Sequence, residues 1–317
     1  MARVATVFGG SGFIGRYVVQ RLARQGWVVR VAARDAEKAH FLQPLGNVGQ
    51  IVRMPVPIQD DEAVQWAVNG ADAVFNLVGI LAEAGGRQTF EAVQNQGAAR
   101  IARAAKAAGV KRLVQVSAIG ADANSNSVYA RTKGLGEQVV LEAFPEATIL
   151  RPSIVVGPED KFFNLFAAMA RYSPALPLIG GGKTRFQPVY VGDIADAAMK
   201  AVQTPDTKGR TYELGGPRVY TFKELMQLML RTIQRRRLLL PIPFRVAEIQ
   251  GSIMQRLPKP LLTRDQVELL KQDNVVSSGA LTFKDLGITP QSIEIVIPSY
   301  LEVYRAGGRF SASQPQG

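Results

Sequence analysis

The sequence contains no cysteine and one histidine, and these absences narrow the chemistry open to it. Without cysteine there are no disulfides, no thiol nucleophile and no cysteine-ligated iron–sulfur cluster. His40 alone cannot supply a histidine metal centre or a Ser-His-Asp triad, so we expect no metal site. The sequence also lacks an apolar run of the roughly 20 residues with which a helix crosses a bilayer.

No leader precedes the first predicted strand, which begins near residue 3, so we expect neither a signal peptide nor a transit peptide. The chain has 317 residues, enough for one large domain or two modest ones. Residues 306–317 are rich in glycine, serine, glutamine and proline, and we expect this tail to be disordered.

Charge is one-sided, because 38 Lys and Arg against 26 Asp and Glu give a net charge of +12. Residues 231–264 hold eight basic residues against one acidic residue, Glu248, and therefore carry +7 of this total. This excess of positive charge indicates a binding partner that carries negative charge. Nucleic acid is not favoured, since the segment has no aromatic platform and the chain shows no nucleic-acid-binding fold.

Apolar residues in the same segment recur at spacings of three or four: Val246, Ile249, Ile253 and Leu257. The basic residues lie toward the two ends of the segment. One interpretation is a segment that lies on an anionic membrane surface. The other is an ordinary core-facing helix with a solvated basic rim. The spacing alone does not decide between them.

The most informative stretch covers residues 3–34. Residues 4–8 are apolar and β-branched and predict a buried parallel strand. Residues 13–25 predict an amphipathic helix, and residues 27–33 the next strand. The turn between the first strand and the helix holds Gly9, Gly10, Gly12 and Gly15. This context favours a dinucleotide site over a glycine-rich turn without a ligand.

Each glycine has a physical task in such a site. Gly9 allows the tight turn, Gly12 lets a pyrophosphate approach the backbone, and Gly15 lets the helix pack close to the strand. The first helical residues, Phe13 and Ile14, offer backbone N–H groups at the positive end of the helix dipole.

Two arginines favour NADP(H) over NAD(H). In an NAD site, a carboxylate at the end of the second strand accepts a hydrogen bond from the ribose 2′-hydroxyl. At this place the sequence has Ala33 followed by Arg34. Arg16 opens the first helix, and a pair of guanidinium groups suits a 2′-phosphate. Asp35 is a competing candidate for the ribose, but it lies beyond the strand, where it fits better as a cap for a helix near Ala36.

Strand and helix patterns alternate up to about residue 150, which predicts an α/β fold with a Rossmann-type doubly wound parallel sheet. Predicted strands are 50–54, 72–77, 111–117 and 147–151, and predicted helices are 60–69, 91–108 and 127–144. The strand at 72–77 places Asn76, Val78 and Gly79 at a carboxyl strand end, so we expect them to contact the cofactor.

We expect the dinucleotide-binding domain to cover residues 1–155, with 188–215 returning to it. Residues 156–187 and 216–305 form a smaller, mostly helical C-terminal part. In this second half we predict helices at 162–171, 193–202 and 222–233, a short strand at 212–214, and a loop over the proline- and glycine-rich residues 173–182.

Tyr129 and Lys133 form a Tyr-x-x-x-Lys pattern within a predicted helix, where residues four apart share a face. The ammonium of Lys133 can lower the phenol pKa and also bond the nicotinamide ribose. Tyr129 would then act as general acid toward a carbonyl, which a serine would orient. This pattern resembles that of the short-chain dehydrogenase/reductases, and the resemblance implies that Ser117, at the end of a strand, is that serine and that Asn95 stands for the asparagine of their preceding helix.

Longer motifs narrow the family: VFGGSGFIGR at 7–16, YARTKGLGE at 129–137, FPEATILRPS at 144–153, VGPEDKFFN at 156–164, QPVYVGDI at 187–194 and LTRDQVE at 262–268. With its Gly-x-x-Gly-x-x-Gly turn the chain resembles the extended or atypical short-chain dehydrogenase/reductases. Over nearly its full length it resembles the dinucleotide-binding accessory subunits of respiratory complex I.

This resemblance implies a fold that holds NADPH tightly and stays outside the electron path. It implies partners among the other subunits of complex I and a place where the hydrophilic arm meets the membrane arm. A bacterial member is then expected to lie peripherally on the cytoplasmic face of the inner membrane, and to stabilise or assemble the complex without turnover of its own.

Two other functions stay open. Ser117, Tyr129 and Lys133 are all present, so the chain also fits a free NADPH-dependent reductase or epimerase. The other is a redox-sensing regulator, which would respond to bound NADP(H) without catalysing a reaction. The loop between Ser117 and Tyr129 is short and polar and leaves little with which to build a substrate pocket, which favours the structural subunit.

Overall fold

The computed structural model describes residues 2–257 and 260–308, and the chain divides into two units. Unit 1 comprises the described residues of 1–152 together with 191–214 and 276–289. Unit 2 comprises the described residues of 153–190, 215–275 and 290–308. The chain therefore leaves unit 1 and returns to it twice.

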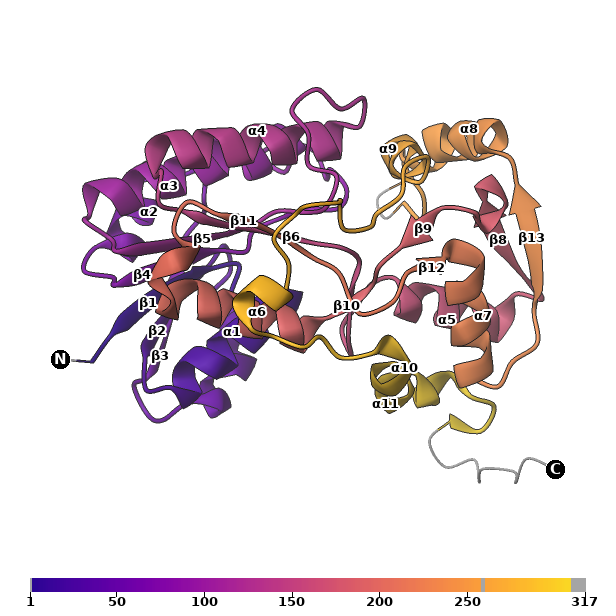
Figure 1. Cartoon of the computed structure of the whole chain (residues 1–317), viewed down its shortest axis with the longest axis horizontal. Coiled ribbons are helices and arrows are strands. Elements are labelled where there is room, and N and C mark those ends of the chain that lie inside the picture. The colour runs from indigo at the N-terminus through magenta and orange to yellow at the C-terminus, as the bar shows by residue number, and fades with distance from the viewer. Residues whose placement is uncertain (1, 258–259, 309–317) are drawn as a thin grey trace. The chain divides into compact units, whose positions relative to one another are not determined.

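Within the described residues, unit 1 is built on a seven-stranded parallel sheet with the order β11-β6-β5-β4-β1-β2-β3 (Figure 1). Its strands are β1 (Val4–Phe8), β2 (Val28–Ala33), β3 (Ile51–Pro55), β4 (Ala73–Asn76), β5 (Arg112–Val116), β6 (Thr148–Pro152) and β11 (Thr211–Leu214). The strand order reverses between β1 and β4. Open α/β sheets bind their ligands at such a switch point, at the carboxyl ends of the strands.

Helices cover both faces of this sheet, as Figure 1 shows. On one face α1 (Phe13–Arg24) packs against α6 (Val191–Gln203). On the other face α2 (Asp61–Val68), α3 (Gly97–Ala107) and α4 (Val128–Ala143) lie in a row. Apolar side chains from the strands and from this row form a buried core. The predicted doubly wound α/β fold is thus confirmed.

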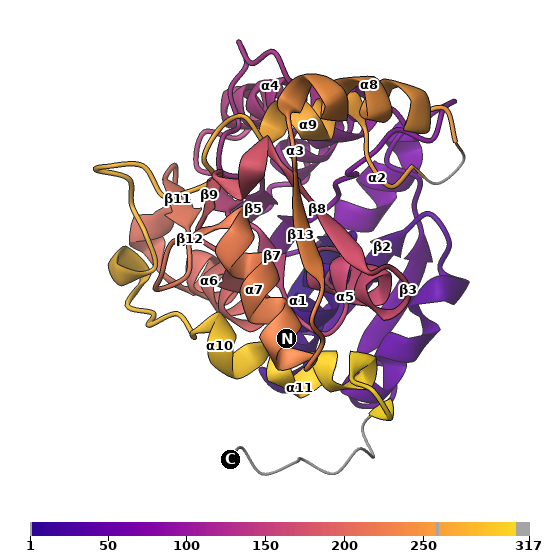
Figure 2. The same cartoon turned by 90° about the vertical axis from the view of Figure 1, so that its right-hand side faces the viewer.

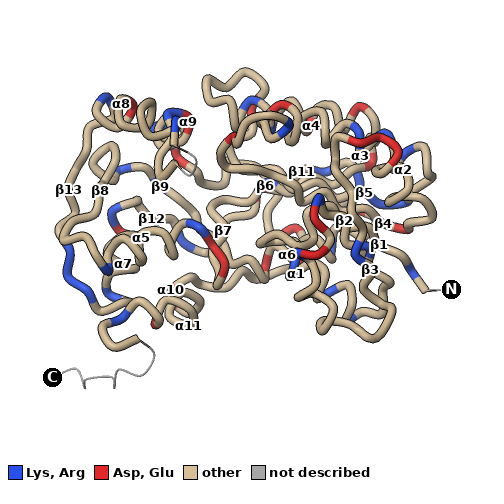
Figure 3. The backbone as a smooth tube through the Cα atoms, turned by 180° about the vertical axis from the view of Figure 1, so that it is seen from behind, with Lys and Arg blue, Asp and Glu red and all other residues tan. Residues whose placement is uncertain are grey.

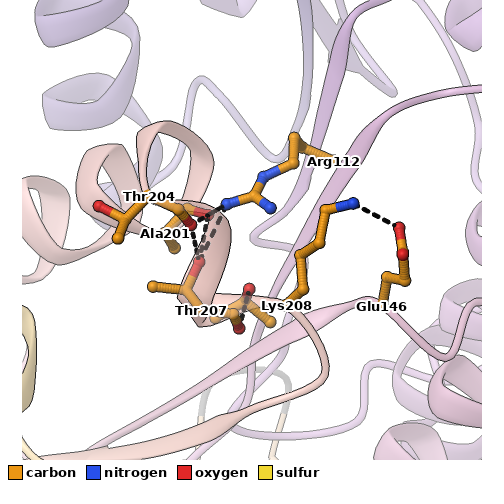
Figure 4. Close-up of polar contacts among 7 residues, drawn as sticks. Arg112, Glu146, Ala201, Thr204, Thr207 and Lys208 are labelled. Atoms are coloured by element: carbon orange, nitrogen blue, oxygen red, sulfur yellow. Dashed lines mark hydrogen bonds and ion pairs between the residues drawn. The ribbon is translucent and has the colours of Figure 1, made fainter.

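Arg112, the first residue of β5, holds the first returning segment against the sheet (Figure 4). Its Nη2 donates to the carbonyl of Ala201 at 2.7 Å, to the carbonyl of Thr204 and to Thr207 Oγ1 at 3.0 Å. Thr148 of β6 donates from Oγ1 to the carbonyl of Thr207 at 2.8 Å. Arg112 and Thr148 thus bond the last turn of α6, at Ala201, and the residues that directly follow this helix.

The second returning segment runs along the outer edge of β11. The backbone N–H of Glu213 donates to the carbonyl of Leu281 at 2.8 Å, and the N–H of Ser277 donates to Glu213 Oε2 at 2.8 Å. The segment also carries the short helix η5 (Lys284–Leu286). Residues 276–289, predicted to lie in the C-terminal part with the rest of 216–305, therefore belong to unit 1, because they pair with the edge strand β11.

Unit 2 contains, among its described residues, three two-stranded sheets: β7 (Val155–Val156) with β10 (Val189–Tyr190), β8 (Ala175–Ile179) with β13 (Leu238–Ile242), and β9 (Arg185–Phe186) with β12 (Tyr220–Thr221). Its α-helices are α5 (Phe163–Tyr172), α7 (Phe222–Thr232), α8 (Phe244–Met254), α9 (Arg264–Leu269), α10 (Ile293–Val296) and α11 (Pro298–Leu301), which Figure 2 shows from a second side. Two short 3₁₀ helices, η3 (Gly180–Gly182) and η6 (Glu302–Tyr304), also lie in this unit. A second apolar core lies among α5, α7, α10 and α11.

The predicted loop over residues 173–182 is wrong at its centre, where β8 lies. This strand pairs in parallel with β13, with Leu176 opposite Leu239 and Pro177 opposite Leu240. Its partner is some 60 residues away in sequence, and the prolines in both strands hide the alternation that marks a strand locally.

Two predicted helices differ in type. The helix expected over 91–108 begins as a π-helix, η2 (Glu91–Gln96), before it continues as α3. The helix expected near Ala36 is the 3₁₀ helix η1 (Glu37–Leu45), which contains Pro44, a residue that removes one N–H donor. Of the tail predicted to be disordered, residues 309–317 lie outside the described residues.

Candidate functional site

The glycine turn lies at the switch point of the sheet and is shaped by close backbone approaches. Gly9 has a φ of +75°, and the N–H of Gly12 donates to the carbonyl of Gly9 at 2.9 Å. A Cβ added to Gly15 would come within 2.2 Å of the Gly9 oxygen and 2.6 Å of the Gly10 Cα. Only glycine at position 15 therefore allows α1 to pack on this turn.

The N-terminus of α1 carries no side-chain cap. Gly12 is its N-cap residue, and no acidic residue lies in the first turn, which begins with Phe13, Ile14 and Gly15. A Cβ at position 12 would meet only the Gly9 oxygen, at 3.1 Å, so the approach to the backbone there is otherwise open. Uncapped N–H groups at a helix N-terminus suit a phosphate.

Two basic residues stand beside this turn. Arg16 lies on the first turn of α1, with its guanidinium 4.7 Å from the centre of the Phe41 ring. Arg34 follows the last residue of β2 and is exposed. Their positions at the ends of α1 and β2 are compatible with a phosphate on the adenosine ribose.

Asp35 is engaged locally. Its carboxylate accepts from the N–H groups of Glu37 and Lys38, at 3.1 and 3.4 Å, and lies 3.2 Å from the Lys38 ammonium. The hydrogen bond from Lys38 lowers the pKa of this carboxyl below its usual range. Asp35 thus bonds the first N–H groups of η1, in line with its interpretation as a cap.

Asn76, Val78 and Gly79 lie where β4 ends, as the sequence predicts. The Asn76 side chain is buried, donates from Nδ2 to Gln115 Oε1 at 2.7 Å and accepts from the N–H of Val78 at 3.2 Å. A Cβ on Gly79 would lie 3.3 Å from the Lys133 ammonium nitrogen. Gly79 therefore leaves room for the charged end of Lys133 at this strand end.

Lys133 is buried on α4 and reaches the end of β5. Its Nζ donates to the carbonyl of Val116 at 3.3 Å, directly before Ser117. Burial lowers the pKa of Lys133 from 10.5 to about 8, and the nearby charge of Glu137 opposes this shift. Among the described residues, Val116 is the one hydrogen-bond partner of its three donors, so the ammonium has capacity for a ligand.

Ser117 is buried, and its Oγ has no hydrogen-bond partner among the described residues. Its backbone N–H donates to the carbonyl of Leu150 at 2.7 Å, which fixes its place beside β6. A buried hydroxyl without a partner is costly and is one mark of a site that a ligand completes. Ser117, Lys133 and the glycine turn thus fit a bound dinucleotide.

Tyr129 lies one turn before Lys133 on α4, and the two share a helix face. Its ring packs edge-on against Phe90, with the ring centres 5.8 Å apart. The phenol is half-buried. Tyr129 therefore lies beside Lys133 on α4, at the position that a general acid would occupy if the protein reduced a carbonyl.

Asn95 lies on the outer side of unit 1. Its Nδ2 donates to Glu91 Oε1 at 2.9 Å, and the residue lines a surface cavity of about 590 Å³ between α2 and α3. The neighbouring Gln94 is the buried one, and its carboxamide has no partner among the described residues. Sequence reasoning missed Gln94, since the π-helical turn, which changes the faces of residues 94 and 95, has no local signature.

The basic segment, residues 231–264, lies in unit 2, and Figure 3 shows its blue run between α7 and β13. Two of its arginines bond backbone carbonyls, since Arg235 donates to Tyr304 at 2.8 Å and Arg237 to Ala170 at 2.8 Å. Arg231 and Arg236 are exposed. Lys259 lies outside the described residues.

The apolar positions of α8 point outward. Ile249 and Ile253 are 64% and 63% exposed, and Val246 is exposed as well, as is Leu257 just beyond the end of the helix. The residues that α8 buries are Ala247 and Gly251, against a small cluster with Ile179 and Val267. The interpretation as an ordinary core-facing helix is therefore wrong. In the described ranges, no helix combines the length and apolar character needed to cross a membrane.

Fold and site together define a Rossmann-type protein of the short-chain dehydrogenase/reductase kind. Residues 5–215 match the sequence pattern of the NAD dependent epimerase/dehydratase family. The chain is 38% identical to the mitochondrial NADH dehydrogenase [ubiquinone] 1 alpha subcomplex subunit 9 of Arabidopsis thaliana, over 96% of this chain and 79% of that one. It is 34% identical to the mitochondrial NADH-ubiquinone oxidoreductase 40 kDa subunit of Neurospora crassa, over 96% and 80%.

The chain therefore belongs to the NAD dependent epimerase/dehydratase family, within the group that these complex I subunits form. Among solved structures, a dTDP-glucose 4,6-dehydratase of Streptomyces venezuelae with NAD and TYD bound superposes with a TM-score of 0.69. Its identity is 21%, over 95% of this chain and 96% of that one, so this likeness concerns the fold. The resemblance noted from the sequence motifs is confirmed.

Proposed function

We propose that this protein is a non-catalytic, NADP(H)-binding subunit of respiratory complex I that stabilises or assembles the complex where its hydrophilic and membrane arms meet. The observation that carries the proposal is the alignment of 96% of the chain with subunits of NADH:ubiquinone oxidoreductase at 34–38% identity. This alignment includes the C-terminal part, beyond the end of the family match at residue 215.

A nicotinamide dinucleotide is the cofactor that the family and the site support. The glycine turn and the uncapped N-terminus of α1 would hold the pyrophosphate, and Lys133 would bond the nicotinamide ribose. Arg16 and Arg34 would bind the 2′-phosphate of NADP(H), since Asp35, the carboxylate that follows Arg34 in the sequence, is engaged in η1. When bound, the nucleotide would complete the hydrogen bonding of Ser117.

The exposed face of α8 supports a peripheral place at an anionic membrane surface. Apolar side chains at Ile249 and Ile253 stand between exposed arginines at Arg245 and Arg256. Aliphatic groups would enter the headgroup boundary while each cation adds about 1 kcal/mol of attraction. In a bacterium this surface is the cytoplasmic face of the inner membrane, and in mitochondria the matrix side.

The test of this function is co-purification from native membranes. After extraction in mild detergent, the protein should migrate with NADH:quinone oxidoreductase activity on a native gel and carry stoichiometric NADP(H). Its deletion should lower the amount of assembled complex. A monomeric protein in the soluble fraction, with full levels of complex in the deletion strain, contradicts the proposal.

Ser117, Tyr129 and Lys133 support one alternative, a free NADPH-dependent reductase or epimerase, because Lys133 and the end of β5 meet as such catalysis requires. In that case the purified protein should oxidise NADPH with a carbonyl substrate, and Tyr129→Phe should abolish the rate while nucleotide binding persists. Unchanged oxidation by Tyr129→Phe would exclude the tyrosine as its general acid.

A further inference from the structure

A series of buried and half-buried charged groups begins behind Lys133. Glu137 lies one helical turn later on α4, with a side chain that is 7% exposed. Arg151 on β6 donates from Nε to Glu137 Oε1 at 2.9 Å and from Nη2 to Glu137 Oε2 at 2.6 Å. Two parallel bonds of this kind fix a carboxylate in both position and orientation.

The series continues from Arg151 to the second returning segment. Arg151 Nη1 lies 3.5 Å from Oε1 of Glu213, whose side chain on β11 is 8% exposed. The other oxygen of Glu213 accepts from the N–H of Ser277 at 2.8 Å. Groups of alternating sign thus connect the lysine of the cofactor site to residues 276–289, and all of them belong to unit 1.

We infer that Glu137 is a positioning residue of the dinucleotide site and that, through Arg151 and Glu213, nucleotide occupancy is coupled to the docking of residues 276–289. The inference rests on the proposed binding of a nucleotide beside Lys133. Glu137 supplies the counter-charge that keeps a buried ammonium protonated, and the protonated form donates to ribose hydroxyls.

The coupling follows from the cost of an unpaired buried charge. When one partner of a buried ion pair is displaced, the other is left desolvated and uncompensated. A ribose that bonds Lys133 would fix the first group of the series, and each later group constrains the next. By reciprocity, a segment 276–289 held at Glu213 would raise nucleotide affinity by the same factor.

The experiment uses the full-length protein, with NADPH titrated by calorimetry and hydrogen exchange of residues 276–289 measured with and without nucleotide. NADPH should protect this segment in the native protein. Glu137→Gln should weaken NADPH binding about tenfold, within the usual range of coupling between sites, and should remove the protection. Glu142→Gln, an exposed glutamate on the same helix, is the matched control and should change neither quantity.

The pH dependence of NADPH binding distinguishes a positioning role of Glu137 from a role in packing alone. The groups that face Lys133 are Tyr129 and Glu137 on its own helix, the Val116 carbonyl and Ser117 hydroxyl at the end of β5, and Gly79 after β4. Of these, Glu137 is the counter-charge. Glu137→Gln should therefore move the alkaline limb of NADPH binding to lower pH, since Lys133 then loses its proton more readily.

The possible failures are distinguishable. A native protein that binds no nicotinamide dinucleotide overturns the proposed function, and this inference with it. A native protein that binds NADPH, with Glu137→Gln and Glu213→Gln binding it equally well, overturns the inference alone. If Glu137→Gln does not fold, Glu213→Gln and hydrogen exchange of the native protein test the coupling instead. Unchanged exchange at 276–289 on NADPH binding contradicts the coupling.

Discussion

Lys133 donates its one hydrogen bond within the described residues to the carbonyl of Val116, at 3.3 Å, from a fully buried ammonium. The carbonyl belongs to the last residue of β5, so the lysine reaches the strand end at which the ligand is expected. One neutral acceptor and the nearby charge of Glu137 compensate only in part for the lost hydration of the ammonium. Without a ligand, Lys133 therefore weakens the fold.

Stability of the nucleotide-free protein should consequently depend on pH between about 8 and 10.5. Folding lowers the pKa of Lys133 from 10.5 to about 8, so in this window the unfolded chain binds a proton that the folded chain does not. Stability should rise with pH through the window, and below it Lys133 costs about 3 kcal/mol.

Lys133→Met should abolish this rise, increase the melting temperature at pH 7 and prevent nucleotide binding. Thermal unfolding from pH 6 to 10.5, with and without NADPH, measures all three effects. Lys200→Met, at an exposed position of α6, serves as the control and should keep the rise. A Lys133→Met protein that is less stable at pH 7 would contradict this account.

Gly15→Ala should cost stability and nucleotide binding together. Its Cβ would overlap the Gly9 oxygen, so α1 must move away from the turn that it packs on. We expect a loss of about 1–3 kcal/mol in the free energy of unfolding, measured by urea denaturation.

The matched substitution is Gly26→Ala at the end of α1. Gly26 has a φ of +76° with nothing within 4 Å of an added Cβ, so the strain there is in the backbone alone. It should cost about 1–2 kcal/mol and leave nucleotide affinity unchanged. Equal loss of affinity in both variants would mean that stability, and not the turn geometry, governs binding.

Arg34→Ala should reduce the preference for NADPH over NADH. If the guanidinium bonds the 2′-phosphate, its removal should weaken NADPH binding about tenfold or more and leave NADH binding nearly unchanged. Titration of both nucleotides by fluorescence measures the ratio of dissociation constants. Lys38→Ala, beside Asp35, is the control for a general loss of positive charge. A ratio that Arg34→Ala leaves unchanged would show that Arg34 does not bind the 2′-phosphate.

The double variant Ile249→Ser, Ile253→Ser should detach the protein from membranes without unfolding it. Both side chains are more than half exposed, so the melting temperature should hardly change. Transfer of an isoleucine out of water contributes about 1.5–3 kcal/mol, so their loss should shift the protein to the soluble fraction in flotation with anionic vesicles. Ile295→Ser, at a side chain 76% exposed on α10, should leave flotation unaffected.

Local sequence patterns were enough to predict most of the strands and helices of unit 1. The strand at Val4–Phe8 lies where its apolar run indicates, and α1 begins at Phe13 directly after the turn. Ser127 was the expected start of the long fourth helix, and its hydroxyl accepts from the N–H of Ala130 as an N-cap. Neighbouring residues determine such features, so they can be read without the fold.

Contacts between distant residues escaped prediction. β8 depends on β13, whose residues follow some 60 positions later. The pairing of Arg151 with Glu137 and Glu213 joins three elements, and no spacing in the sequence indicates it. Glu137 lies four residues after Lys133 in the same predicted helix, and this spacing is the one local sign of the charged series.

The amino-acid sequence by itself determined the Rossmann-type crossover, its glycine turn and the family, because a few adjacent residues with fixed backbone demands specify them. Only the tertiary structure decided that the apolar face of α8 points to solvent and that residues 276–289 return to β11. Which face of a helix is buried, and which strand edge a segment joins, depends on partners far along the chain, and local periodicity carries no record of them.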